Sequence, residues 1–225
     1  MRTHFDKQLD KLNDELIEMG SMIEKAIEHT IKALVTQDID LANYVIESDE
    51  QVNRQERDIE SLCLKLLLQQ QPVARDLRQI SSALKMITDL SRIGEQAGNI
   101  AEILGKAEFG RDYDTTLLQQ MATAAKKMVS TSLDAFVKGD LRLAQQVERD
   151  DDVVDELFSR AKKELIQVIR STQDSGEQAI DYLMIAKYFE KIGDHAVNIS
   201  QWVLFMITGA HEEDTVHDLL RGGRS

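Results

Sequence analysis

One phrase occurs twice in this chain, as RIGEQAGNI at residues 92–100 and as KIGDHAVNI at residues 191–199. Each copy combines a basic residue, Ile-Gly, a carboxylate, an alanine and Asn-Ile at identical spacing, and the copies lie 99 positions apart. An acidic phrase precedes each copy, DEQVN at residues 49–53 and DDVVD at residues 151–155. A repeat of such long period indicates a tandem duplication. We therefore expect two similar halves that carry matching polar sites.

The composition favours a helical core and argues against a nucleic-acid partner. A hydrophobic content of 42% is enough for a packed core, while a single proline and only 5% aromatic residues suit long helices. The net charge of −13 repels phosphate backbones and anionic lipid surfaces. The longest apolar run, residues 202–207, is far shorter than a membrane span, so we expect no insertion into the membrane.

Two further features predict a cytoplasmic protein. Residues 1–7 lack the apolar stretch of a signal peptide. Cys63 is the only cysteine, so the chain contains no internal disulfide. Because leucines flank Cys63 on both sides, a small buried hydrophobic role is favoured over a reactive thiol.

Apolar residues recur at steps of three and four positions almost throughout the chain, which predicts helices. Asp38 is the expected N-cap of the second helix, Pro72 a first-turn residue of the third, and Gly139 the C-terminal stop of the fourth. The break at residues 36–38 matches the break at residues 138–140. The six expected helices cover residues 4–36, 38–70, 72–106, 114–138, 140–171 and 177–209.

These six helices predict an all-α fold of two tandem antiparallel three-helix bundles, because short loops join helices that are neighbours in space. The first bundle is expected in residues 1–108 and the second in residues 114–209, with a loose tail at residues 210–225. Residues 108–114 break the periodicity and mark the expected boundary. The pattern does not say how the two bundles pack against each other.

The second half carries an acidic constellation. Glu190, Asp194 and Asn198 occur at positions i, i+4 and i+8 of the sixth expected helix and therefore form one stripe. Asp151 and Asp155 have the same i, i+4 relation on the fifth. Since these two helices are expected to be antiparallel neighbours, four carboxylates and one amide are predicted to converge.

Like charges at i, i+4 destabilise a helix, so this constellation calls for a counter-charge. A hard cation with oxygen ligands is one answer, such as Mg²⁺, Mn²⁺, Ca²⁺ or iron. Salt bridges from Arg92 and Lys191 within their own helices are a second answer. A third interpretation is an ordinary solvated acidic face, because 40 of the 225 residues are acidic. The duplication of both phrases favours a site over that third interpretation.

The first half carries a weaker copy of the constellation. It retains Asp49, Glu95 and Asn99, but Ser91 stands where the second half has Glu190, and Asn53 stands where it has Asp155. We expect a metal site here to be weaker or to need other ligands.

The repeated phrase also contains residues that we do not assign to a metal site. Gly94 and Gly193 each cost about 1 kcal/mol relative to alanine inside a helix, which we attribute to close approach between helices. His195 lies about 100° around the helix from Asp194, so we expect an exposed histidine and no ligand. Trp202 is expected in the core or an interface.

Enzyme motifs are absent. The chain contains no Gly-rich phosphate loop, HExxH or GxSxG, and no Glu-x-x-His of the kind that ferritin-like di-iron bundles use twice. Carboxylates alone leave open a metal-dependent hydrolase acting on phosphate compounds at a di-metal centre, although no general base or arginine clamp accompanies them. A purely structural helical protein is the other alternative.

The chain resembles the PhoU family of phosphate-signalling regulators. The resemblance covers residues 5–209 and is carried by QPVARDLR at residues 71–78, DLSRIGE at residues 89–95 and FEKIGDHAVNI at residues 189–199. The family pattern at the third and sixth helices is Glu/Asp-x-x-x-Asp. Glu190 and Asp194 match this pattern fully, whereas Ser91 and Glu95 depart from it.

The resemblance implies a cytoplasmic regulator that is not an enzyme. The implied role is to repress the phosphate-starvation response and to restrain phosphate uptake when phosphate is plentiful. The implied partners are the ATPase subunit of the phosphate ABC transporter and the phosphate sensor histidine kinase, and the chain is expected to form a homodimer. The resemblance also implies metal clusters at the acidic motifs, for which iron, manganese, zinc and magnesium are the candidate ions.

Overall fold

The computed structural model describes residues 2–69, 72–106, 114–171 and 176–210. These residues form six α-helices and confirm the all-α fold class. The predicted boundary at residues 108–114 falls almost wholly outside the described residues, as does the tail beyond residue 210, so both stay predictions. The helices are α1 (Arg2–Thr36), α2 (Ile39–Gln69), α3 (Ala74–Lys106), α4 (Thr116–Lys138), α5 (Leu141–Ser171) and α6 (Gly176–Thr208).

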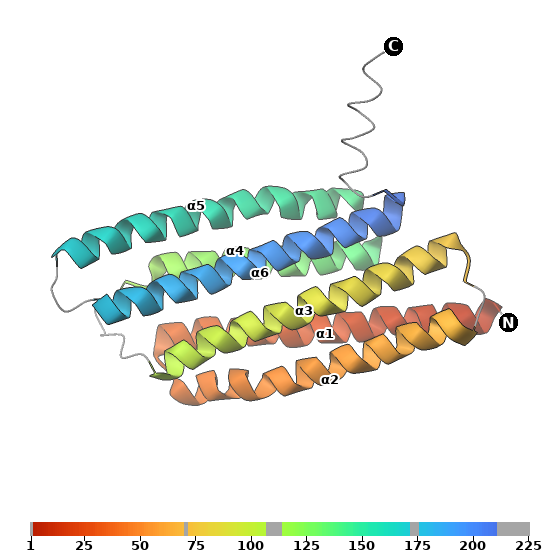
Figure 1. Cartoon of the computed structure of the whole chain (residues 1–225), viewed down its shortest axis with the longest axis horizontal. Coiled ribbons are helices and arrows are strands. Elements are labelled where there is room, and N and C mark those ends of the chain that lie inside the picture. Colours follow the sequence, from red (N-terminus) through yellow and green to blue (C-terminus); the bar gives the residue numbers. More distant parts are fainter. Residues whose placement is uncertain (1, 70–71, 107–113, 172–175, 211–225) are drawn as a thin grey trace, which may run out of the picture.

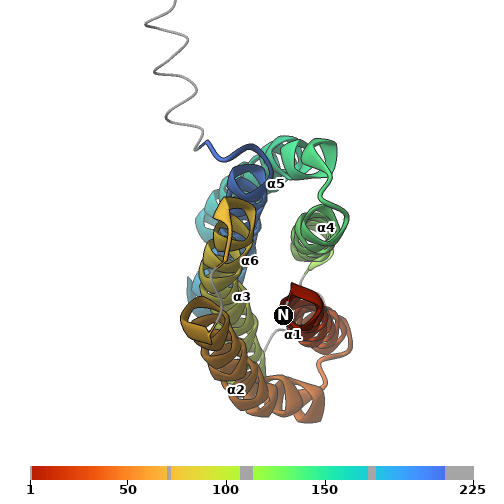
Figure 2. The same cartoon turned by 90° about the vertical axis from the view of Figure 1, so that its right-hand side faces the viewer.

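Two layers of helices run along the molecule (Figure 1). Figure 2, which looks along the helices, shows a curved layer in the order α2, α3, α6, α5 and a second layer made of α1 and α4. Within each half the three helices pack against one another, and the halves meet where α3 packs on α6 and α1 packs on α4. The two bundles therefore lie side by side.

One hydrophobic core extends through both halves. It includes fully buried side chains of α1, α3, α4 and α6, among them Ile23, Ile93, Met128 and Ile192. Gly20 of α1 allows a close approach to α4, because a Cβ atom there would clash with the Leu133 side chain. Such a core stabilises the halves jointly, because burying apolar surface at their junction contributes to the folding of both.

The two breaks within the halves have the same construction. Gln37 and Gly139 both adopt a left-handed conformation, with φ of 53° and 59°. Asp38 then caps α2 by accepting a hydrogen bond from the Leu41 N–H at 3.0 Å. In the second half Asp140 accepts one from the Arg142 N–H at 2.8 Å, which lowers the pKa of that carboxyl. The predicted caps are confirmed.

The start of α3 differs from the prediction. Pro72 precedes the helix instead of lying in its first turn, because the helix begins at Ala74. The Val73 N–H donates to Asp76 Oδ2 at 3.2 Å, so the third residue of the helix reaches back to the residue before its start. The Leu77 N–H also donates to the Val73 carbonyl at 3.0 Å, so the N-cap lies at Val73.

None of the described helices combines the length and the apolar character that crossing a bilayer requires.

Candidate functional site

The structure brings four carboxylates of the second half together, and we call them the second-half acidic cluster: Asp151 and Asp155 on α5, Glu190 and Asp194 on α6. The pKa of Asp151 rises to about 6, first because burial disfavours its charge and then because the other three carboxylates and Asp152 repel it. The pKa of Asp194 is also raised, by burial and by Glu190. These shifts mark a site where negative charge is concentrated and partly desolvated.

Gly193 allows α5 and α6 to approach at this cluster. A Cβ atom on Gly193 would lie 3.2 Å from Asp151 Oδ1 and 3.6 Å from the Met128 side chain. The Asp151 carboxylate therefore packs directly against the backbone of α6 at Gly193. Gly94 plays the same part in the first half, where a Cβ atom would lie 3.5 Å from Asp49 Oδ1. The close approach predicted for both glycines is what the structure shows.

Among the described residues, the lysine that pairs with this cluster is not the predicted one. Lys187 forms an ion pair with Glu190, three residues further along α6. Lys191, the predicted partner, directly follows Glu190 and is turned about 100° away from it. Its ammonium lies over the Tyr188 ring, 5.9 Å from the centroid.

In the first half, neutral groups hydrogen-bond one of the two oxygens of the buried Asp49 carboxylate. Asn53 Nδ2 donates to Asp49 Oδ2 at 2.8 Å, and Ser91 Oγ donates to Asn53 Oδ1 at 3.1 Å. Glu95 forms its predicted ion pair with Arg92 at 2.6 Å. Burial raises the pKa of Asp49 while the Asn53 amide lowers it, and the buried Asp49 Oδ1 has no hydrogen-bond partner among the described residues.

Asn198, the fifth predicted member of the site, has a hydrogen-bond partner outside the second-half acidic cluster. Its Nδ2 donates to Asp89 Oδ1 of α3 at 3.1 Å. The stripe of positions i, i+4 and i+8 drifts by about 40° at each step, so the third member has turned towards α3. Asn99 occupies the equivalent position on α3 and is half-buried there.

The prediction that the His195 side chain is exposed is wrong. It is partly buried, and its Nδ1 lies 2.9 Å from Asp89 Oδ1. Asp89 thus joins α3 to α6 through two partners. The role of Asp89 is not predictable from local spacing, because its two partners lie in the other half of the chain.

As the side chains stand in the structure, no group of three or more His, Cys, Asp or Glu residues in the described part of the chain is arranged to hold a metal ion. The donor chemistry of the second-half acidic cluster nevertheless fits a hard cation, because its ligands are carboxylate oxygens whose charge burial and mutual repulsion disfavour. In the first half, Asp49 Oδ1 is a buried carboxylate oxygen without a hydrogen-bond partner among the described residues.

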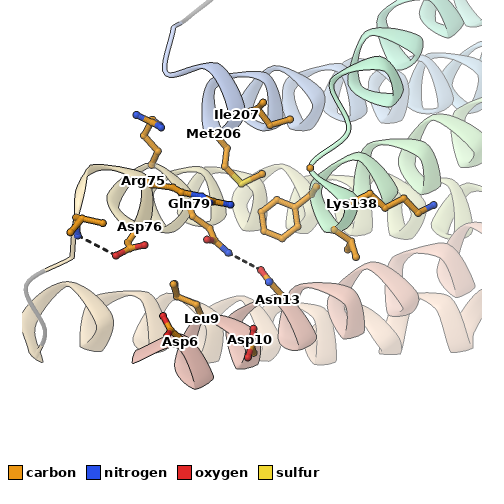
Figure 3. Close-up of a pocket in the computed structure, with 15 residues that line it drawn as sticks. Asp6, Leu9, Asp10, Asn13, Arg75, Asp76, Gln79, Lys138, Met206 and Ile207 are labelled. Atoms are coloured by element: carbon orange, nitrogen blue, oxygen red, sulfur yellow. Dashed lines mark hydrogen bonds between the residues drawn. The ribbon is translucent and has the colours of Figure 1, made fainter. Parts of the chain in front are cut away.

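A cavity of about 610 Å³ lies at one end of the molecule, where α1, α3, α4 and α6 meet (Figure 3). Gln79 Nε2 donates to Asn13 Oδ1 at 3.1 Å across it, from α3 to α1. Its charged lining is balanced between acids and bases, namely Asp6, Asp10, Asp76, Arg75, Arg78 and Lys138. Part of the phrase at residues 71–78 therefore lines a junction between the halves.

Comparison with known proteins gives a consistent family assignment. The family described as "PhoU domain" matches residues 16–104 and again residues 118–203. A homologue of the phosphate-specific transport system accessory protein PhoU from Clostridium acetobutylicum is 35% identical over 210 residues, which are 92% of this chain and 96% of that protein. Homologue 1 from Thermotoga maritima is 31% identical over 99% of this chain and 95% of its own.

Two solved structures share the fold. The crystal structure of PhoU from Pseudomonas aeruginosa has a TM-score of 0.87 at 32% identity and covers 92% of this chain and 100% of that chain. The phosphate transport system regulatory protein PhoU from Streptococcus pneumoniae has a TM-score of 0.86 at 25% identity, with coverages of 92% and 98%. Because the family match includes both repeats and the relatives extend over nearly the whole chain, this chain belongs to the PhoU family.

Proposed function

We propose that this chain is a regulatory accessory protein of phosphate-specific transport, acting in the cytoplasm without catalysis. It restrains phosphate uptake and represses the phosphate-starvation response by contacting the ATPase subunit of the phosphate ABC transporter and the phosphate sensor histidine kinase. The observation that supports this most strongly is the match of both repeats to relatives that are named as accessory proteins of this transport system.

A deletion strain tests the regulatory role. With the gene removed, a reporter of the phosphate-starvation response is expected to stay on in phosphate-rich medium, and the wild-type gene is expected to switch it off again. Purified transporter ATPase and kinase should each bind the immobilised protein. A reporter that stays repressed without the gene would contradict the regulatory role.

The homodimer is part of the same proposal. Light scattering on the purified protein is expected to give twice the 25.5 kDa mass of the chain. If the mass is that of a single chain at concentrations up to about 100 μM, the homodimer proposal is contradicted. A dissociation constant weaker than this corresponds to an association free energy of less than about 5.5 kcal/mol.

The second-half acidic cluster is the proposed metal site, for iron, manganese, zinc or magnesium. Its four carboxylates would hold the ion, which would supply the positive charge that Lys187 alone does not provide and so shape a docking face. Burial and then repulsion by the neighbouring carboxylates raise the pKa of Asp151, and an ion would offset both by adding positive charge. The first-half residues Asp49, Glu95 and Asn99 form the weaker candidate, because Asn53 and Arg92 already engage two of them.

Elemental mass spectrometry tests the metal site. The wild-type protein is expected to contain stoichiometric metal, which the double variant Glu190→Gln/Asp194→Asn loses. The matched control Asp49→Asn alters the first half and should retain most of the metal. Absence of metal from the wild-type protein, after incubation with each candidate ion, would contradict the site.

The same samples separate the adaptor from the hydrolase alternative. A chelator is expected to weaken binding of the ATPase or the kinase while the helical circular dichroism signal is unchanged. Turnover of a generic phosphoester by the metal-loaded wild type, absent from the double variant, would instead establish a hydrolase.

A further inference from the structure

Two arginines of α3 line the cavity of about 610 Å³ where α1, α3, α4 and α6 meet, which we call the end cavity. Arg75 and Arg78 are three residues apart, so their side chains leave the helix at neighbouring positions. Neither forms a hydrogen bond or an ion pair with another described residue, and the Nε atom of Arg78 is buried without a partner. A buried donor without an acceptor costs free energy, which an acceptor bound in the end cavity would recover.

The end of α6 holds the Arg78 side chain in place. Gly209 follows the last residue of α6 and has a left-handed backbone, with φ of 78°. A Cβ atom on Gly209 would lie 3.2 Å from Arg78 Nη1 and 3.5 Å from Arg78 Cζ, so the guanidinium packs directly against this backbone. The negative end of the α6 dipole attracts a cation here, but no carbonyl of the described residues accepts a hydrogen bond from Arg78 Nε.

The acids and bases of the end cavity lie on different sides of it. Figure 3 shows that Arg75 leaves α3 on the side of α6, whereas Asp6 and Asp76 lie on the side of α1. Asp76 is already engaged, because it accepts a backbone N–H at the start of α3. Lys138, the third cation of the lining, forms an ion pair with Asp134 at 2.6 Å. The two arginines are therefore the cations of this lining that can bind a ligand.

The fold does not require these arginines. The second repeat, displaced by 99 positions, has Asp174 in place of Arg75 and Glu177 in place of Arg78. Acids suit the start of a helix because its dipole is positive there, and cations at the same place are unfavourable. The start of α3 thus carries two charges that oppose the local preference, and such conflicts are expected at functional sites.

We propose that the end cavity binds a doubly charged oxyanion of the phosphate class between Arg75 and Arg78. Guanidinium groups bind phosphate oxygens through paired, charge-assisted N–H···O hydrogen bonds. The N-terminus of α3 adds the attraction of its dipole for an anion. The cavity volume of about 610 Å³ is in the range of small-molecule sites, so it accommodates a free phosphate ion or the phosphoryl group of a small organic molecule.

The proposed anion would lie at a junction of the two halves. Arg78 belongs to α3 of the first half, and Gly209 directly follows α6 of the second half. A ligand that binds Arg78 would therefore stabilise the packing of α3 on α6. This site goes beyond the proposed function, because it involves neither a protein partner nor the second-half acidic cluster.

Isothermal titration calorimetry of the chelator-treated full chain with inorganic phosphate tests the site. Wild type is expected to bind phosphate, and Arg78→Gln is expected to weaken binding by about ten-fold or more through the loss of charge-assisted hydrogen bonds. Lys138→Gln is the matched control, because it removes one positive charge from the same cavity but from a side chain that is paired with Asp134. Its affinity should stay close to that of wild type.

Two further variants separate a built site from general charge. Gly209→Ala leaves every charge in place, but its Cβ atom would displace the Arg78 guanidinium, so it is expected to weaken binding. Glu190→Gln/Asp194→Asn alters the proposed metal site and should bind phosphate as wild type does. Circular dichroism confirms that each variant remains helical.

The source of the oxyanion is distinguished by a second titration with glycerol 1-phosphate. If wild type binds this ester more tightly than inorganic phosphate, with the same dependence on Arg78, the ligand is a phosphorylated small molecule. If wild type binds neither compound, or if Arg78→Gln and Lys138→Gln weaken binding equally, the oxyanion site is wrong. The proposed function stands in both of these cases, because the calorimetry involves no partner protein.

Discussion

Among single residues, Asp151 shows how the duplicated halves have diverged. Its counterpart Asp49 has an amide partner in Asn53, whereas Asp151 faces three further carboxylates of the second-half acidic cluster. In the first half, neutral side chains thus hydrogen-bond the partly buried Asp49 carboxylate. The second half retains a repulsion that only a bound cation or a proton can relieve, which is why its acids carry the metal proposal.

Burial of Asp151, together with this repulsion, makes the stability of the metal-free protein depend on pH. The pKa of Asp151 is about 6 in the folded protein against 3.8 for the free side chain, so between these values the folded state binds the proton more tightly. Stability attributable to Asp151 therefore falls as pH rises through this window and is regained at lower pH. In chelator-treated protein, Asp151→Asn is expected to be more stable than wild type at pH 7, by about 1 kcal/mol after allowance for solvent screening.

Urea unfolding at pH 7 and pH 5 measures this effect. The stability difference between Asp151→Asn and wild type should shrink at pH 5, where wild-type Asp151 is largely protonated. An advantage of the variant that stays constant between the two pH values would show that Asp151 is not the titrating group.

Cys63 illustrates a residue whose role the sequence does predict. It is fully buried, and burial raises the pKa of its thiol to about 12. Because the thiolate is the reactive form, we expect a thiol reagent at pH 8 to label the native protein over hours, and the urea-unfolded protein within seconds to minutes. The absorbance of the released chromophore follows both reactions, and rapid labelling of the native protein would contradict this burial.

Other single residues were not predictable from spacing. Asn198 and His195 both meet Asp89, a residue more than 100 positions away in sequence. A helical stripe identifies which side chains share a face of one helix. It does not identify the helix that the face meets, and the drift of about 40° per four residues decides this for Asn198.

At the level of helices, the glycines of α3 and α6 differ in what a side chain would meet. Gly98 of α3 has open space where a Cβ would lie, whereas Gly193 has Asp151 Oδ1 at 3.2 Å. We expect Gly98→Ala to stabilise the protein by up to about 1 kcal/mol through helix propensity. Gly193→Ala gains the same propensity but displaces the Asp151 carboxylate, so it should be the less stable of the two variants and lose bound metal.

Urea unfolding and elemental analysis of the two variants check this prediction together. Equal stabilisation by both alanines, with metal retained, would show that the contact at Gly193 has no structural consequence.

The helix bounds were largely predictable because residue types with local effects set them. Asp38 and Asp140 cap their helices through hydrogen bonds to nearby N–H groups, and Gly139 adopts the left-handed conformation that its type allows. Pro72 misled the prediction because Asp76 provides a competing local signal that places the helix start after it. Gln37 adopts a similar left-handed conformation without the residue type that would have signalled it.

Across the whole molecule, the side-by-side packing of the halves was not predictable from the repeat. Each repeat accounts for its own three helices, whereas α6 must also meet α3. The one indication in the sequence is that α6 has apolar residues on more than one side. Ile185 and Ile192 are fully buried, while Trp202 is partly buried and its carbonyl accepts a hydrogen bond from Ser82 of α3 at 3.0 Å.

A shared core predicts that the two halves unfold together. Leu16 is fully buried on α1 in the first half, and Leu16→Ala is expected to lower the unfolding free energy by about 2–5 kcal/mol. Trp202 on α6 is the only tryptophan, so its fluorescence reports on the second half, whereas far-ultraviolet circular dichroism reports on all the helices. Both signals should move to lower urea concentration by the same amount.

Ile17→Ala is the matched control, because Ile17 is the next residue of α1 and is 45% exposed. It should shift neither transition by more than about 0.5 kcal/mol, the usual range for surface substitutions. If Leu16→Ala instead removes part of the circular dichroism signal while the Trp202 transition is unchanged, each half folds alone. In that case the contacts of α3 with α6 and of α1 with α4 would join two independent units, and the second-half acidic cluster could be studied on the second half by itself.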